Sequence, residues 1–264
     1  RQQVGQRAGD RSVAGLLGGA KTGAVRLSWT VQSPTLDGVE RALEEGCAAG
    51  YRHFNIKLGP PQTPAYDLEL VRRVVAFSPE GFHWGDANTS YTLEVALDMA
   101  PRLADAGLRA LESPLPPAAI RGYQKLRAQR ALPILMDEGI VSAAETEEFI
   151  ALGMMDGIAM KIARCGGLWH AARIVKSLRD NGLAMYASGL TDPDLSLAAS
   201  VQLFAWAGLD LPAALNGPQY LGGRGTTDAA FRAVADVVRL PDAPGLGITL
   251  DPAAQQSLRI VAEA

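Results

Sequence analysis

The sequence predicts an α/β fold of the closed (β/α)8 barrel type. Short apolar runs alternate with longer amphipathic stretches from residue 26 onward. The alternation repeats at roughly 25–30 residues, the length of one strand–helix unit in such a barrel. Eight such units form either a closed barrel or an open doubly wound sheet. No G-x-G-x-x-G motif follows the first strand, which argues against an open dinucleotide-binding sheet and favours the barrel.

Each predicted strand is a short, largely apolar run, and most predicted helices carry apolar residues at i, i+3, i+4 and i+7. We expect the strands over residues 26–32, 53–58, 82–88, 109–114, 133–138, 157–163, 183–188 and 212–217. We expect the helices between them over residues 35–50, 63–78, 93–107, 118–130, 142–153, 168–182 and 195–208. Several of these helices end in glycine, the residue favoured just past a helix C-terminus.

The chain changes character after residue 222. One helix-like stretch over residues 227–239 is followed by a Pro/Gly turn and a polar tail. We interpret these as a last helix and a C-terminal extension rather than a second domain. The predicted division is therefore an N-terminal tail or linker over residues 1–25, a barrel domain over residues 26–239 and an extension over residues 240–264.

Composition excludes several classes of protein. The chain has 25 Lys and Arg against 28 Asp and Glu, a net charge of −3, so we expect neither a nucleic-acid surface nor a polybasic membrane anchor. No apolar run reaches the roughly 18 residues that a membrane-spanning helix needs. The two cysteines, Cys47 and Cys165, have no C-x-x-C spacing. A disulfide framework or structural zinc site is therefore not expected, and a cytoplasmic location fits.

Charged residues lie at the ends of five consecutive predicted strands. They are Lys57, Asp86, Glu112, Asp137 and Lys161, each separated from the next by one strand–helix unit. Taken singly, each could be a solvated loop residue or half of a local ion pair. In a barrel, however, the carboxyl ends of all strands face one mouth, where active sites are built. We therefore expect three carboxylates and two lysines to converge there.

This set of side chains predicts a particular chemistry. Three carboxylates without His or Cys make an oxygen-only site that suits Mg²⁺ or Mn²⁺, and we expect no organic cofactor. A nearby cation lowers the pKa of a lysine, and a neutral lysine can abstract a proton. The same cation would stabilise the enediolate formed when a proton is removed next to a carboxylate.

Six segments together resemble one known family. They are FNIKLG (54–59), WGDAN (84–88), LESPL (111–115), ILMDEG (134–139), MKIARCGGL (160–168) and PDAPGLG (241–247). In order and spacing they are similar to the motifs of the mandelate racemase/muconate lactonizing enzyme group of the enolase superfamily. The resemblance covers about residues 12–252. It implies a modified enolase-type barrel. Such proteins normally also carry an N-terminal capping domain, which we do not expect within the 25 residues that precede the first predicted strand.

The resemblance also implies roles for the charged residues. Asp86, Glu112 and Asp137 match the family's three metal ligands, and Lys57 and Lys161 match the two lysines that face each other across the substrate. A lysine on each face is typical of the muconate lactonizing branch. The mandelate racemase branch uses a His on the seventh strand, and the predicted seventh strand here has none.

Five further positions are candidates for contacts with the substrate or the ligands. Asn55 stands where the family usually has the first lysine of a K-x-K motif, and Asp192 stands near the position of a family glutamate. Asn88 is either a substrate contact or a simple turn amide. Glu138 either pairs with a lysine or contacts the metal. Arg164 either binds a distal substrate carboxylate or forms an external salt bridge.

The resemblance implies a metal-dependent isomerase, a racemase, epimerase or cycloisomerase, that removes the α-proton of a small carboxylate substrate. Dehydration of a hydroxy acid passes through the same enediolate and remains the alternative reaction. A non-catalytic binding or scaffold barrel is the alternative of another class, and a nicotinamide-dependent oxidoreductase on an open sheet is the least favoured. Because barrels of this family often assemble, we also expect a homo-oligomer.

Overall fold

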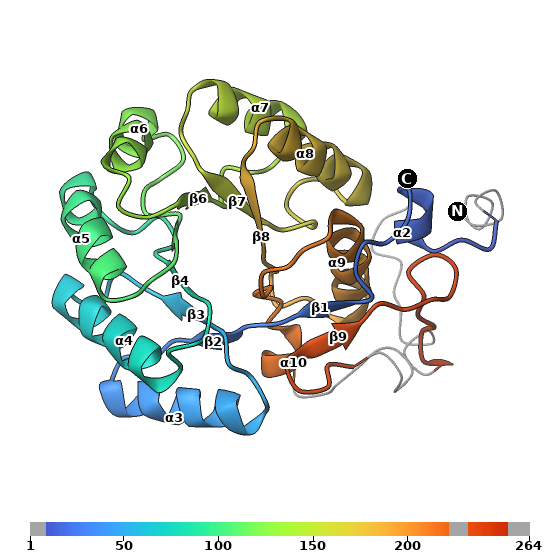
Figure 1. Cartoon of the computed structure of the whole chain (residues 1–264), viewed down its shortest axis with the longest axis horizontal. Coiled ribbons are helices and arrows are strands. Elements are labelled where there is room, and N and C mark those ends of the chain that lie inside the picture. Colours follow the sequence, from blue (N-terminus) through green and yellow to red (C-terminus); the bar gives the residue numbers. More distant parts are fainter. Residues whose placement is uncertain (1–8, 222–231, 253–264) are drawn as a thin grey trace.

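A parallel seven-stranded sheet curls into a ring that is surrounded by helices (Figure 1). The computed structural model describes residues 9–221 and 232–252. The strands of the ring follow one another in chain order: β2 (Trp29–Val31), β3 (Phe54–Lys57), β4 (His83–Asp86), β5 (Leu111–Glu112), β6 (Ile134–Met136), β7 (Gly157–Met160) and β8 (Ala184–Ala187). This arrangement confirms the α/β barrel class that the sequence predicts.

The eighth position of the ring is a short bridging segment rather than a full strand. Ala213 forms an isolated parallel bridge with Leu27, and Ala214 forms one with Ser188. This two-residue segment lies between the first and last strands of the sheet. The expected strand over residues 212–217 is therefore wrong in its length. Its first residue, Pro212, has no N–H to donate, and at its other end helix α10 (Gly217–Tyr220) begins.

The expected first strand, over residues 26–32, is also corrected. Its first residue belongs to β1 (Ala24–Arg26), which pairs antiparallel with β9 (Val237–Arg239) in a separate two-stranded sheet. The expected helix over residues 227–239 is wrong where the structure describes it, because residues 237–239 form β9. Val238 is fully buried there opposite Val25, and β-branched residues fit a half-buried strand. Residues 227–231 of that expectation lie outside the described residues.

Helices follow the strands around the outside of the ring. They are α3 (Leu36–Ala48), α4 (Pro64–Phe77), α5 (Leu93–Asp105), α6 (Ile120–Gln129), α7 (Ala143–Ala151), α8 (Leu168–Asp180) and α9 (Asp194–Ala207). Thr35, Thr63, Thr92 and Ser142 cap four of them, each side chain accepting a backbone N–H from the first turn. A short helix that the sequence did not predict, α2 (Val13–Leu16), packs against α9. Within the described residues no helix is long and apolar enough to cross a membrane.

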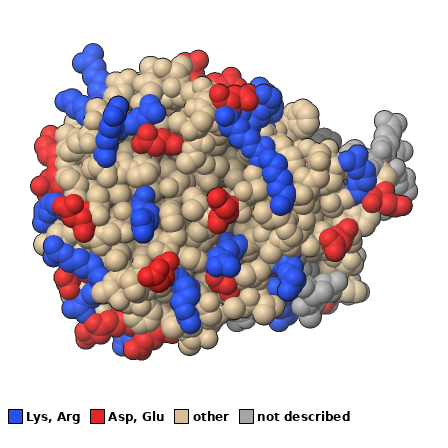
Figure 2. Space-filling view, in the orientation of Figure 1, with Lys and Arg blue, Asp and Glu red and all other residues tan. Residues whose placement is uncertain are grey.

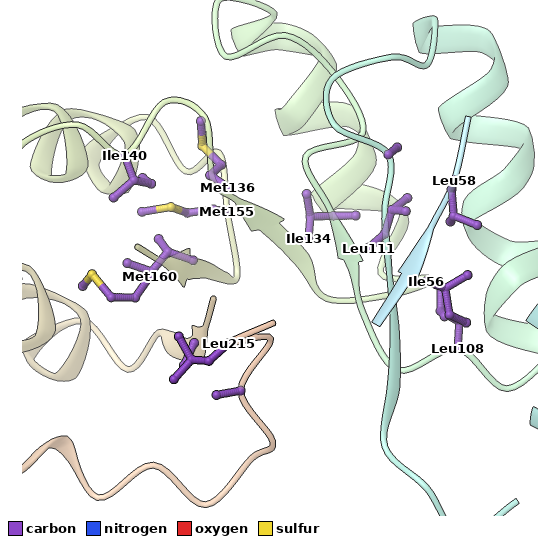
Figure 3. Close-up of a cluster of buried hydrophobic side chains, with 14 of the residues drawn as sticks. Ile56, Leu58, Leu108, Leu111, Ile134, Met136, Ile140, Met155, Met160 and Leu215 are labelled. Carbon is purple, nitrogen blue, oxygen red and sulfur yellow. The ribbon is translucent and has the colours of Figure 1, made fainter. Parts of the chain in front are cut away.

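Two apolar clusters lie on the two faces of the curled sheet. The larger one fills the space between strands and helices. It includes Ile56 of β3 and Leu58, the residue that follows β3 (Figure 3). A smaller cluster contains Trp84, Ala110, Leu135, Tyr186 and Ala214. Since side chains alternate along a strand, Ile56 and Leu58 point to the helices, and the residues between and before them point into the ring. This alternation positions the charged strand ends inside the mouth.

The surface carries charges of both signs. In the face drawn in Figure 2, Lys and Arg side chains are interspersed with Asp and Glu side chains. No extended area of a single sign occupies that face.

Candidate active site

Five charged side chains lie at the carboxyl ends of neighbouring strands, as the sequence predicts. In the sheet register, Lys57 lies beside Asp86 and Asp86 beside Glu112. Asp137 and Lys161 directly follow β6 and β7. One carboxylate oxygen from each of Asp86, Glu112 and Asp137 lies within 4.8 Å of the others. Each of these three residues is only 1% exposed, so the structure brings three acidic groups together away from bulk water.

The two lysines lie at the two ends of this carboxylate group. Lys57 Nζ is 2.5 Å from Asp86 Oδ2, and Lys161 Nζ donates to Asp137 Oδ2. Burial alone would lower the pKa of Lys57, but the charges of Asp86 and Glu112 outweigh it and raise that pKa. Burial raises the pKa of Asp137, and the neighbouring Lys161 offsets part of this shift. The lysines and carboxylates therefore partly neutralise one another.

Glu112 is the least compensated of the three acids. Its Oε2 accepts a hydrogen bond from Trp84 Nε1 at 2.8 Å, whereas its Oε1 is buried and has no hydrogen-bond partner. Burial, together with the charges of Asp86 and Asp137, raises the pKa of Glu112 well above its usual range. A buried carboxylate that has one oxygen without a donor and lies beside two further carboxylates fits a divalent cation with oxygen ligands.

Trp84 belongs both to the smaller apolar cluster and to the surroundings of the carboxylates. It is fully buried within the ring, and its indole N–H holds Glu112. A signal for this role was present in the sequence, because Trp84 precedes Asp86 by two residues and thus shares its face of the strand.

Asn88 links the lysine side of the site to Glu138. Its backbone N–H donates to Asp86 Oδ1 at 2.8 Å, and its side-chain Oδ1 lies 3.2 Å from Lys57 Nζ. Its Nδ2 donates to Glu138 Oε1 at 3.1 Å. Burial would raise the pKa of Glu138, but hydrogen bonds from Ser113 and Asn88 outweigh it and lower that pKa. Glu138 is therefore held by Ser113 and Asn88, and among the described residues it forms no ion pair with either lysine.

Arg164 donates to Asp137 Oδ1. Asp137 thus accepts from both Arg164 and Lys161. The partner of Arg164 is a buried carboxylate of the site, whereas the two alternatives from the sequence were a distal substrate carboxylate and an external salt bridge. The backbone of Asp137 is also held, since its N–H donates to Ser113 Oγ at 3.2 Å and its carbonyl accepts the N–H of Ile140 at 2.9 Å.

Asn55 and Asp192 make no hydrogen bond with Asp86, Glu112 or Asp137 among those of the described residues. Asn55 is 3% exposed and points into the ring two residues before Lys57, and its Nδ2 has no hydrogen-bond partner. Asp192 is buried in the loop between β8 and α9, where Oδ2 accepts the N–H of Leu190 at 3.3 Å. Burial raises the pKa of Asp192, and the charge of Lys161 partly opposes this.

The geometry agrees with the comparison to known families. A family model described as enolase C-terminal domain-like matches residues 38–254 of the chain. The chain belongs to this family. The match confirms the resemblance to the enolase superfamily that the sequence motifs indicated.

Relatives within the family carry different names. A chloromuconate cycloisomerase from Pseudomonas sp. (strain P51) is 29% identical over 93% of this chain and 66% of its own length. An o-succinylbenzoate synthase from Geobacillus stearothermophilus is 29% identical over 89% of this chain and 61% of its own length. The chain thus spans less than two thirds of the length of these relatives. A solved muconate lactonizing enzyme from Klebsiella pneumoniae shares the fold, with a TM-score of 0.85, 24% identity and coverage of 94% of this chain and 69% of that one.

Proposed function

We propose that this barrel is the catalytic part of a divalent-metal-dependent isomerase that removes the α-proton of a carboxylate substrate. The observation that carries the proposal is the buried group of Asp86, Glu112 and Asp137 with a lysine at each end. A decayed or purely structural barrel would have little reason to keep five buried or half-buried charges in one place, since each is costly to desolvate.

The three carboxylates would hold the cation, with Mg²⁺ or Mn²⁺ as the ions that oxygen ligands suit. When bound, such an ion supplies positive charge beside the carboxylate of the substrate and thereby stabilises the charge left by proton removal. Trp84 would orient Glu112 through the indole hydrogen bond. No organic cofactor is required by this chemistry.

Lys57 and Lys161 would carry the proton. Each ammonium group is bonded to a carboxylate of the proposed ligand set, Asp86 or Asp137. A carboxylate that held a cation would stabilise the ammonium charge less, which would bring the raised pKa of Lys57 down toward the range useful for proton transfer. One neutral lysine then takes the α-proton at its Nζ, and the charged lysine on the other side donates a proton to the opposite face. Transfer between opposite faces inverts the carbon, which gives racemisation or epimerisation.

The same proton removal begins two other reactions. Relatives of similar identity are named chloromuconate cycloisomerase and o-succinylbenzoate synthase, which supports cycloisomerisation as a variant of the isomerase proposal. It also supports dehydration of a hydroxy acid as the second candidate. In each case the substrate is a small carboxylate, and Lys57 or Lys161 would remove its α-proton.

Solvent deuterium incorporation tests the proposal. The protein is incubated in D₂O with Mg²⁺ and pooled carboxylates, and α-deuterium is measured by mass spectrometry for the unmodified chain, Lys57→Ala and Lys161→Ala. We expect exchange that requires Mg²⁺ and is lost in at least one of the two lysine variants. Exchange unaffected by either substitution would contradict the proton-carrying role of the lysines, and no exchange together with no Mg²⁺ binding by calorimetry would favour the binding barrel instead.

A further inference from the structure

A pocket of about 600 Å³ opens beside Lys57 at the mouth of the ring. It lies between the segments that follow β2, β3 and β4, and Lys57, Ala87 and Asn88 form the side nearest the carboxylate group. Its volume is within the roughly 300–1,000 Å³ of small-molecule sites. A substrate with its α-carbon at Lys57 Nζ would extend its distal part into this pocket.

The walls of the pocket are fixed by hydrogen bonds that do not use its interior. Tyr66 Oη donates to the carbonyl of Ser33 at 2.7 Å, which joins the β2–α3 segment to α4. Asp67 is 1% exposed and accepts the N–H of Gly59 at 3.0 Å and the hydroxyl of Tyr91 at 2.7 Å. The pocket is therefore preorganised, which reduces the entropic cost of binding a ligand there.

The polar groups that remain free in the pocket are uncharged. Gln32, which is exposed, and Gln62, which is half-buried, line the pocket, and neither side-chain amide makes a hydrogen bond within the described part of the chain. Each amide can both donate and accept. Among the described residues that line the pocket, Lys57 has the single charged side chain, and it forms an ion pair with Asp86. Arg164 does not line the pocket and is bonded to Asp137.

We propose that this pocket selects substrates whose distal group is an uncharged hydrogen-bonding group, an amide or a hydroxyl, over substrates with a second carboxylate. The inference rests on the proposed function and adds a substrate class to it. A second carboxylate placed here would lose hydration without gaining a cation of its own. An amide or hydroxyl would gain partners that can match both its donors and its acceptors. The preference differs from what the name of a muconate enzyme implies, because muconate is a dicarboxylate.

A matched pair of ligands tests the inference. N-acetylglutamine and N-acetylglutamate have the same length and the same α-carbon and differ in their distal group, an amide or a carboxylate. Dissociation constants are measured by calorimetry with Mg²⁺, and α-deuterium exchange is measured in parallel. We expect the amide to bind at least about threefold to tenfold more tightly, the effect of one or two net hydrogen bonds.

A substitution that adds charge sharpens the test. Gln62→Lys would supply the missing cation, so we expect the glutamate derivative to gain at least about tenfold in affinity, as for a charge-assisted pair. Gln62→Ala should weaken the amide ligand more than the carboxylate ligand, because the amide loses a partner for both its donors and its acceptor. Gln129→Lys is the matched control, since it adds the same charge at the C-terminal end of α6, away from the mouth. Circular dichroism melting checks that each variant folds.

The outcomes separate this inference from the proposed function. Binding that favours the amide without any α-deuterium exchange would support the pocket and count against the isomerase. Exchange with equal or better binding of the dicarboxylate would support the isomerase and overturn the pocket proposal. Failure of the amide ligand to bind, or no gain for the carboxylate in Gln62→Lys, would also overturn it.

Discussion

Replacing Trp84 with Phe tests whether the indole positions Glu112 as a metal ligand. The donor and acceptor are 2.8 Å apart, Trp84 is fully buried and Glu112 is 1% exposed, so water has little access to replace the lost donor. A hydrogen bond to a charged acceptor contributes about 1.5–3 kcal/mol. We therefore expect Mg²⁺ affinity to fall by about tenfold to a hundredfold, the range typical for groups that hold a metal ligand.

Isothermal titration calorimetry with MgCl₂ measures this effect, and Tyr186→Phe is the control. Tyr186 belongs to the same buried cluster as Trp84, with ring centroids 6.4 Å apart, but its hydroxyl has no contact with Glu112 among the hydrogen bonds of the described residues. We expect Tyr186→Phe to bind Mg²⁺ like the unmodified chain. Unchanged Mg²⁺ affinity in Trp84→Phe, or an equal loss in both variants, would refute the reasoning.

Three further predictions concern the ligands, their protonation and the wall of the pocket. Asp137→Asn should weaken Mg²⁺ binding more than tenfold (~1.4 kcal/mol or more), because an anionic ligand is lost; calorimetry that gives the unmodified affinity would contradict this. Because the pKa of Glu112 is raised, its ionisation destabilises the metal-free fold, and we expect the melting temperature in EDTA to fall as pH rises from about 5 to about 8. Mg²⁺ should bind more tightly over the same rise in pH, and a flat profile in both measurements would be inconsistent with an acid of raised pKa. Asp67→Ala removes the acceptor shared by Gly59 and Tyr91 and should lower the free energy of unfolding by about 1–3 kcal/mol in urea titrations; unchanged stability would show that this carboxylate does not hold the pocket wall.

The sequence predicts that Lys57, Asp86 and Glu112 lie side by side, because this placement depends on only two sequence periods, that of the strand–helix unit and that of the strand. One strand–helix unit separates each residue from the next, and the two-residue period of a strand decides which side chains enter the ring. Consecutive parallel strands then bring these positions into register. Nothing beyond local patterns is needed for this part of the site.

Features that depend on distant partners were predicted less well. Val237 and Val238 fit the apolar spacing of a helix, but the segment becomes β9 because β1 offers it an antiparallel partner early in the chain. The partner of Arg164 could not be predicted from the sequence either. The sequence does not show whether the guanidinium group stays free for a ligand or pairs with Asp137. Trp84 precedes Asp86 by two residues and could have been predicted to share its face, but an aromatic residue on a buried strand also fits the core.

The bridging segment at the eighth position of the ring has a consequence for the order of assembly. It joins residues that are far apart in sequence, since Ser28 and Ala213 are 185 positions from each other, and such distant contacts form slowly. The charged residues, in contrast, come from the uninterrupted arc of β3 to β7. During synthesis this arc emerges from the ribosome before Ala213 does. We therefore expect the acidic cluster to be complete while the ring is still open.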